Sequence, residues 1–265
     1  MTERTVFASL RKAERVWAVA SIHGEADRLR RLHRDLSRRL GPDDRVVYLG
    51  NVLGRGAAVR DALDELLSFR RLVLARPNGL VQDVALLRGG QEEMWQKLLQ
   101  LQFAASPGEV LDWMLDQGVG TTLAAYGSSA DDARRIVRQG PMAITRWTSK
   151  LRGDFQATGH QAWLSALKHA AFTRGGELLF VSRGLRPDRP LDAQADVFWW
   201  GGGGFDGLAE PYGSYRKVVR GYDPSHRGID AREFTVSLDG GCGFGGPLLA
   251  GCIALDGSLV EVLEA

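Results

Sequence analysis

The stretch RVVYLGNVLGRG, residues 45–56, decides the fold of this chain because an apolar run breaks abruptly into glycine-rich turns. Residues 45–49 are mostly β-branched, aromatic or aliphatic, and they end at Gly50, which predicts a short buried strand. Gly50, Gly54 and Gly56 allow sharp turns and a close approach of the backbone to whatever lies at the end of that strand. In α/β proteins, ligands bind at the carboxyl ends of such strands.

Three other stretches have the same form, an apolar strand that runs into a polar loop containing glycine. They are VWAVASIHGE (16–25), VALLRGGQEE (84–93) and ELLFVSRGLRP (177–187). Four strand ends of one kind predict a single site that is assembled from four parts of the chain.

Length, composition and charge describe an ordinary globular chain. Its 265 residues suffice for one large α/β domain or two small ones, and 44% hydrophobic and 25% charged residues are globular values. A net charge of +2 gives no preference for nucleic acid or membrane surfaces. Cys242 and Cys252 are too few for a disulfide framework. With no signal peptide and no membrane span in view, we expect a cytoplasmic protein without a nucleic-acid partner.

The apolar pattern predicts further elements around the four loops. Residues 1–14 should form a lead-in or an edge element, followed by a strand at 16–20, a helix at 26–40 and a helix at 59–70. A strand is expected at 80–87, helices at 92–103 and 107–117, and a mainly helical stretch at 118–176. Strands should follow at 178–181, 217–219, 234–238, 247–255 and 259–263, the last four as a mostly antiparallel second sheet.

Two features outside these loops leave room for more than one interpretation. The stretch FWWGGGGF (198–205) should form neither a regular strand nor a helix, because four glycines follow two tryptophans. It is either a packed aromatic hinge or an exposed contact for a partner or ligand. His160 and His169 are expected to be ordinary surface or core histidines, since no nearby spacing suits a metal.

Taken in order, the motifs resemble those of the calcineurin-like metallophosphoesterases, most closely the bacterial serine/threonine phosphoprotein phosphatases. That family carries DxHG, GDxxDRG, RGNHE, FVHAGLRP, VVHGHTP and a late DTG…YGG segment. Here the same places read SIHG (21–24), GNVLGRG (50–56), RGGQE (88–92), FVSRGLRP (180–187), VVRGYDP (218–224) and LDGGCGFGG (238–246). The resemblance implies one domain, residues 1–265, with a helical cap-like insertion at about 94–176. It also implies a four-layer αββα sandwich of two mixed β-sheets flanked by helices.

The resemblance further implies which residues would hold two metal ions, and most of those ligands are replaced. Such sites generate a hydroxide nucleophile and clamp phosphoryl oxygens. The six ligand positions read Ser21, His23, Asn51, Gly90, Ser182 and Arg220, so His23 alone is kept. The general acid is replaced by Gln91, the aspartate that orients it by Gly54, and the second histidine of VVHGHTP by Tyr222. Glutamine cannot give a proton to a leaving alkoxide at neutral pH. Because five of the six metal ligands are replaced, neither metal nor another cofactor is expected.

Four arginines stand at or beside these motifs and leave two interpretations open. They are Arg55, Arg88, Arg183 and Arg220. A guanidinium can replace part of the charge of a lost dication and matches phosphate oxygens, which favours an anion pocket for phosphate or a phosphopeptide. The alternative is that the arginines pair with Glu92, Asp223 or Asp239, because buried charges must be paired. For Arg220 we expect such a pair in the volume of the second metal.

Three functions follow from these observations. The favoured one is a catalytically inactive pseudophosphatase that acts as a binding, regulatory or structural subunit with a protein partner. The second is a phosphoesterase with an altered or single-metal site, built on His23, Asn51 and Glu92. The third is a purely structural module that uses its outer surface and ignores the cleft.

Overall fold

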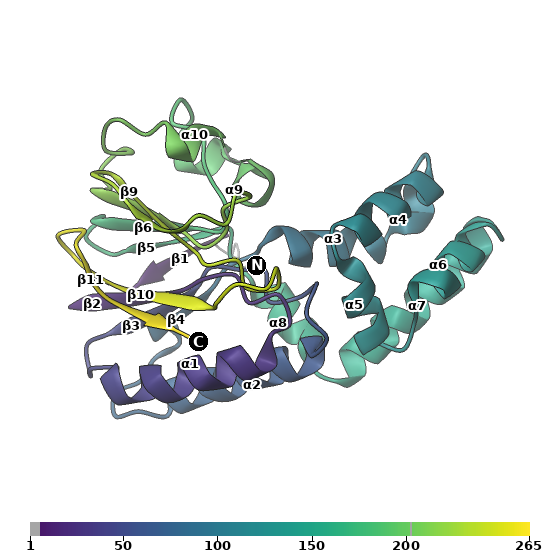
Figure 1. The fold of residues 1–265 in the computed structure, drawn as a ribbon, viewed down its shortest axis with the longest axis horizontal. Coiled ribbons are helices and arrows are strands. Elements are labelled where there is room, and N and C mark those ends of the chain that lie inside the picture. The colour runs from purple at the N-terminus through teal and green to yellow at the C-terminus, as the bar shows by residue number, and fades with distance from the viewer. Residues whose placement is uncertain (1–5, 202) are drawn as a thin grey trace, which may run out of the picture.

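The computed structural model describes residues 6–201 and 203–265, which form two mixed β-sheets (Figure 1). Sheet A has the order β1 (Phe7–Leu10), β5 (Ala170–Thr173), β6 (Leu178–Val181), β7 (Lys217–Arg220), β9 (Thr235–Asp239) and β8 (Gly228–Ala231). Sheet B has the order β11 (Leu259–Glu264), β10 (Leu249–Ala254), β2 (Arg15–Val19), β3 (Arg45–Tyr48) and β4 (Val84–Leu86). Residues 45–56 therefore supply an inner strand of sheet B, between β2 and β4, and the loop that follows it.

The two sheets pack face to face because nearly every central strand is apolar on both sides. Val47 of β3 lies in the core between the sheets with Phe180 and Val219 of sheet A. Its neighbours Val46 and Tyr48 face the opposite way, toward the helices outside sheet B. Alternation along a strand sends successive side chains to opposite faces, and burial of both faces produces the continuous apolar runs in the sequence.

Helices cover the two outer faces and complete four layers. On sheet B, α1 (Ala26–Arg39) and α2 (Val59–Leu74) lie side by side (Figure 1). On sheet A, the cover is α9 (Val197–Trp200) and α10 (Gly203–Asp206), with the short helix η3 (Leu191–Ala193) beside them. The fold class expected from the sequence is confirmed.

The prediction of a separate, mostly antiparallel second sheet was wrong. Strands β7 and β9 join sheet A and pair in parallel, whereas β10 and β11 join sheet B as an antiparallel pair. Strand β8 was missed altogether, since its burial is partial along its length. An apolar pattern indicates that a segment is buried in a sheet, but it does not predict which strand pairs with it.

The FWWGGGGF stretch also differs from its prediction, because it forms two single helical turns. Phe198, Trp199 and Phe205 are buried in the layer outside sheet A, and their packing holds turns that glycine would not favour alone. Of the two interpretations, the buried side chains match the packed aromatic hinge.

A run of helices separates β4 from β5. It contains α3 (Gly90–Leu98), η2 (Leu101–Phe103), α4 (Pro107–Asp116), α5 (Val119–Ala125), α6 (Ala130–Val137), α7 (Pro141–Ala157) and α8 (His160–Ala166). Figure 1 shows α4 to α7 standing away from the two sheets. Two local predictions change: β5 lies within the stretch expected to be helical, and residues 80–87 begin with the short helix η1 (Val81–Asp83) before β4. The limits of the insertion, about 94–176, stay a prediction.

Candidate functional site

The loops after β2, β3, β6 and β7 meet at one end of the two sheets and are joined by backbone hydrogen bonds. The N–H groups of Ile22 and His23 both donate to the carbonyl of Asn51, at 3.0 and 2.7 Å. Ser21 N–H donates to the carbonyl of Gly221 at 3.1 Å, and Gly221 N–H donates in turn to the carbonyl of Ser182 at 3.1 Å. The motif residues of both sheets are therefore brought together.

Asn51 stands where the family has its bridging aspartate, and its amide is already engaged. Its Nδ2 donates to Ser21 Oγ at 3.1 Å, and its Oδ1 accepts from the N–H of Gln91 at 3.0 Å. Both Asn51 and Ser21 are buried. A neutral amide bonded to a hydroxyl and to the backbone carries none of the negative charge that two dications require.

Glu92 is a structural carboxylate and not a ligand that faces the cleft. Its Oε2 accepts from the N–H groups of Gly89 and Asn51, both at 2.8 Å. Its Oε1 accepts from those of Val52 and Leu53, at 2.8 and 3.1 Å. Burial raises the pKa of this carboxyl, and the four backbone hydrogen bonds oppose that rise. Because both oxygens are occupied by backbone donors, Glu92 ties the β3 loop to the start of α3.

Gly54 and Gln91 fit each other as a pair. A β-carbon at position 54 would lie only 2.2 Å from Gln91 Oε1, and Gly54 also has a φ of +84°. The side chain of Gln91 is held there because its Nε2 donates to the carbonyl of Gln117 at 2.8 Å. The space beside the position of the family's general acid is therefore filled by an amide.

His23 is enclosed by aromatic side chains. Its ring centroid lies 5.9 Å from that of Tyr222 and 5.5 Å from that of Phe244, and the residue is only 2% exposed. Neither ring nitrogen has a hydrogen-bond partner within residues 6–201 and 203–265. Burial, with the nearby charges of Arg55 and His226, lowers the pKa of His23 to about 3. The imidazole is therefore neutral at physiological pH.

This low pKa predicts a pH-dependent loss of stability. An unfolded histidine, with a pKa near 6.5, takes up a proton that folded His23 cannot accept until about pH 3. The contribution of neutral His23 to stability is therefore fully present above about pH 6.5 and is lost as the pH falls toward 3. Urea denaturation at pH 6 and pH 4 tests this expectation. Between these two pH values, the unfolding free energy of His23→Asn should fall by about 2 kcal/mol less than that of the natural chain. Equal losses in the two proteins would contradict the buried, neutral histidine.

Arg220 does not lie in the volume of the second metal, where it was expected. Arg220 is fully buried on the face of β7 that carries Val218, with its guanidinium 4.3 Å from the ring of Phe205. It pairs with Asp206 at 3.0 Å and with Asp223 at 3.1 Å. The ion pair with Asp223 is as expected, but it lies outside sheet A. The side chain beside His23 is that of Tyr222.

Two of the four motif arginines are held by groups of the protein. Arg220 also donates from Nε to Ser237 Oγ at 2.9 Å. Arg88 pairs with Glu93 at 2.8 Å and donates to the side chain of Gln96. For these two arginines the structure matches the interpretation in which the charges are paired, although Arg88 uses a carboxylate one residue away from Glu92.

The other two arginines flank Tyr222 without a carboxylate partner in the described part of the chain. The Arg55 guanidinium lies 4.0 Å from the ring of Phe244, and that of Arg183 lies 5.5 Å from the ring of Tyr222. Nε of each is buried and lacks a hydrogen-bond partner among the described residues. Burial raises the pKa of Tyr222, and the charges of both arginines oppose that rise. Burial also lowers the pKa of Arg55.

Sequence reasoning missed two residues of this cluster. Phe244 is 40% exposed, and its ring lies 4.0 Å from that of His226, whose Nδ1 is 2.8 Å from Asp239 Oδ2. Phe244 stands at the tyrosine of the YGG segment, so that motif could have pointed to it. His226 follows VVRGYDP by two residues and carries no motif signal of its own.

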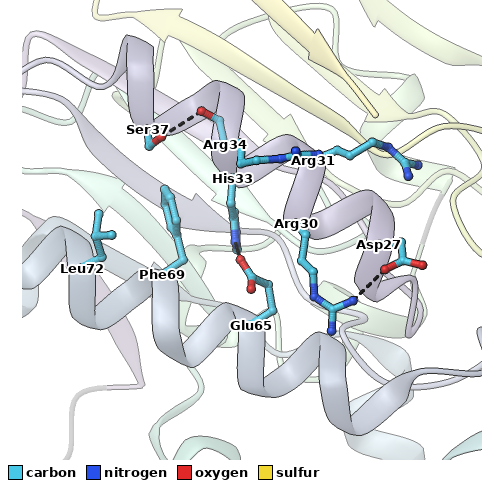
Figure 2. Close-up of a pocket in the computed structure, with 9 residues that line it drawn as sticks. All are labelled: Asp27, Arg30, Arg31, His33, Arg34, Ser37, Glu65, Phe69 and Leu72. Atoms are coloured by element: carbon cyan, nitrogen blue, oxygen red, sulfur yellow. Dashed lines mark hydrogen bonds and ion pairs between the residues drawn. The ribbon is translucent and has the colours of Figure 1, made fainter.

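A separate groove lies between α1 and α2, away from all the motif residues (Figure 2). Its volume is about 610 Å³, and His33 forms part of its floor. The two ring nitrogens of His33 are engaged by Glu65 Oε1 at 2.6 Å and by the hydroxyl of Tyr48 at 2.8 Å, and Phe69 stacks on the ring at 3.9 Å. His33 is therefore a bonded core histidine that joins the two helices to sheet B.

The residues present do not fit a two-metal centre. Around His23 the other motif positions supply a hydroxyl, a bonded amide, glycine and a phenol, which are poor donors for dications. No three histidine, cysteine, aspartate or glutamate side chains are grouped as metal ligands anywhere in residues 6–201 and 203–265. In the same residues, no helix combines the length and apolarity that crossing a membrane requires.

The chain is similar in fold to solved structures of several phosphatases. A protein serine/threonine phosphatase from Saccharomyces cerevisiae with similarity to human phosphatase PP5 aligns over 98% of this chain and 84% of its own, with a TM-score of 0.59 and 13% identity. A candidate diadenosine tetraphosphatase aligns over 98% of this chain and 97% of its own, with a TM-score of 0.56 and 19% identity. A cold-active protein tyrosine phosphatase aligns over 97% of this chain and 80% of its own, with a TM-score of 0.52 and 14% identity.

These comparisons define a shared fold. No protein-family model matches the sequence, and no curated protein sequence matches it either. The chain has the fold of the metallophosphoesterase-like phosphatases, as the motif order predicted. At such low identity the fold alone is shared, so activity must be argued from the site.

Proposed function

We propose that this chain is a pseudophosphatase, a phosphatase fold that has lost metal-dependent hydrolysis and serves as a binding or regulatory subunit of a protein complex. The observation that carries the proposal is that the residues at the replaced ligand positions are engaged in hydrogen bonds within the protein. The Asn51 amide donates to Ser21 Oγ and accepts from the backbone N–H of Gln91, and Glu92 beside it accepts four backbone N–H groups. A metal would have to displace these bonds and would gain only neutral donors in exchange.

The same site offers a phosphoryl group a cationic setting. Arg55 and Arg183 are half-buried beside Tyr222 and bear charges that no described carboxylate balances. A partly desolvated guanidinium without a partner is costly, and a phosphate dianion that contacts both would relieve that cost. We infer that the partner presents a phosphorylated side chain to this pair.

The test combines catalysis with binding. The purified protein, supplied with Mn²⁺, should not hydrolyse p-nitrophenyl phosphate, because both the metal ligands and the general acid are replaced. It should bind a phosphoserine peptide more tightly than the unphosphorylated peptide, by isothermal titration. Arg183→Met should weaken that binding by about 1.5–3 kcal/mol, the usual value for a charged hydrogen bond.

A matched control is Arg138→Met, which removes an exposed arginine from the end of α6 and should leave the affinity unchanged. Hydrolysis that a chelator abolishes would contradict the proposal and favour the single-metal alternative. That alternative has one observation in its favour, since both ring nitrogens of His23 are without partners among the described residues. Absence of both hydrolysis and phosphopeptide preference would favour the purely structural module.

A further inference from the structure

A long groove runs along the side of the sandwich where one edge strand of each sheet is exposed. Its volume is about 1140 Å³, and it is lined by β1 of sheet A, β4 of sheet B and residues of α8. None of the residues at the His23 site contributes to it. An exposed strand edge offers unpaired N–H and C=O groups, which natural proteins usually cover or protect.

Of the two edges, β1 is the open one. On β4, the N–H of Lys168 donates to the carbonyl of Leu86 at 2.9 Å, and the N–H of Arg88 donates to the carbonyl of Lys168 at 2.8 Å. Strand β1 pairs with β5 on one side, no strand among the described residues pairs with its other side, and all four of its residues line the groove. This edge of sheet A is therefore open to the addition of a further strand.

The register of β1 shows which of its backbone groups are available. The carbonyl of Val6 accepts from the N–H of His169, just before β5, at 2.9 Å. Because N–H and C=O of one residue in a parallel strand point to the same side, Ala8 and Leu10 direct theirs toward β5. Phe7 and Ser9 consequently direct theirs into the groove.

The described wall of the groove carries arginines and no acidic side chain. Arg70 and Arg174 line it, and no aspartate or glutamate does so among the residues that the structure describes. This imbalance is local, because the whole chain has 34 basic and 32 acidic residues. Two buried donors on its wall, Arg70 Nε and Trp163 Nε1, also lack hydrogen-bond partners in the described part of the chain. The positive charges of Arg70 and Arg174 favour an occupant that brings negative charge.

We propose that this groove binds an extended acidic segment of a partner protein, which adds to sheet A as a strand beside β1. Backbone hydrogen bonds to Phe7 and Ser9 would supply affinity, and alternate side chains would supply specificity. Apolar side chains of the segment face Trp163 and the other apolar wall residues, and acidic ones face Arg70 and Arg174. This surface is separate from the His23 site and stands whether or not that site binds phosphate.

The experiment uses the full chain and two fluorescent peptides in which valine alternates with glutamate or with lysine. By fluorescence anisotropy, the glutamate peptide should bind at least roughly tenfold more tightly than the lysine peptide, and salt should weaken it. Hydrogen exchange should show new protection in residues 7–10 when the peptide is added, as strand addition requires. Equal binding of both peptides, or binding without protection there, would overturn the proposal.

Two pairs of variants make the test specific. Ser9→Pro removes one N–H that faces the groove, spares the bonds to β5 and should reduce binding about tenfold, whereas Ser9→Ala should not. Arg174→Glu should also reduce binding about tenfold, whereas Arg146→Glu, an exposed arginine of α7 outside the groove, should not. If Ser9→Pro does not fold, the comparison of Arg174→Glu with Arg146→Glu still tests whether the peptide binds in the groove. A dimer of this chain that Ser9→Pro dissolves, together with no peptide binding, would show that a second copy is the occupant and overturn the proposal.

Discussion

Metal binding should return when the missing ligands are rebuilt with a histidine at Tyr222, and it should return far less well with a histidine at Arg220. Tyr222 lies against His23, whereas Arg220 lies on the outer face of sheet A against Phe205. The first variant combines Ser21→Asp, Asn51→Asp, Gly90→Asn, Ser182→His and Tyr222→His; the second has Arg220→His in place of Tyr222→His. We expect the first to bind Mn²⁺ or Zn²⁺ roughly 10- to 100-fold more tightly, the scale on which changes to a metal site alter affinity.

Isothermal titration calorimetry with the metal ion measures the affinity of each variant. Both variants are first checked for folding. One steric cost is common to the two variants, because a β-carbon at position 90 would lie 3.1 Å from Trp200 Cζ3 and the indole must shift. The second variant has a further cost, since Asp206 and Asp223 lose their shared arginine. Equal affinity in the two variants would contradict the prediction that position 222, and not position 220, faces the metal site beside His23.

The largest loss of stability should come from Glu92→Ala. This change leaves the N–H groups of Gly89, Asn51, Val52 and Leu53 without an acceptor in the protein interior. Each stranded buried donor costs about 1–3 kcal/mol, partly relieved by entering water, so we expect a loss of about 4 kcal/mol or more. Chemical denaturation measures it.

The matched control is Glu109→Ala, which removes an exposed glutamate from the first turn of α4. Its loss should stay within about 1 kcal/mol, the value of a charge near a helix N-terminus. If Glu92→Ala is no more destabilising than Glu109→Ala, then Glu92 is not the residue that holds the β3 loop. Glu92 would then again be available as a ligand for the single-metal alternative.

The sequence predicted the layers and the meeting of the loops because both depend on local signals. Short apolar runs followed by glycine placed β2, β3 and β4 to within a few residues, and motif order predicted which loops share an end of the sandwich. The strand partners could not be predicted in the same way. Strands β10 and β11 are apolar and close in sequence to β9, yet they cross to sheet B.

Within the site, the difficulty was the direction of side chains on a strand buried on both faces. Val218, Val219 and Arg220 are all buried, so no alternation of apolar and polar residues shows which of them face the core between the sheets. The structure shows Val219 in that core and Val218 outside it, which sends Arg220 outward. Because successive side chains point to opposite faces of β7, Arg220 faces the outer layer and pairs with Asp206 of α10, and does not reach the metal position.

The fit between Gly54 and Gln91 has a consequence for any attempt to rebuild the general acid. An aspartate at position 54 would collide with the amide of Gln91, since even its β-carbon would lie 2.2 Å from Oε1. A histidine at position 91 without that aspartate would have lost the residue that orients it in the family. A general acid at this place therefore requires both positions to change together, as Gly54→Asp with Gln91→His, because neither single substitution supplies an acid together with the residue that orients it.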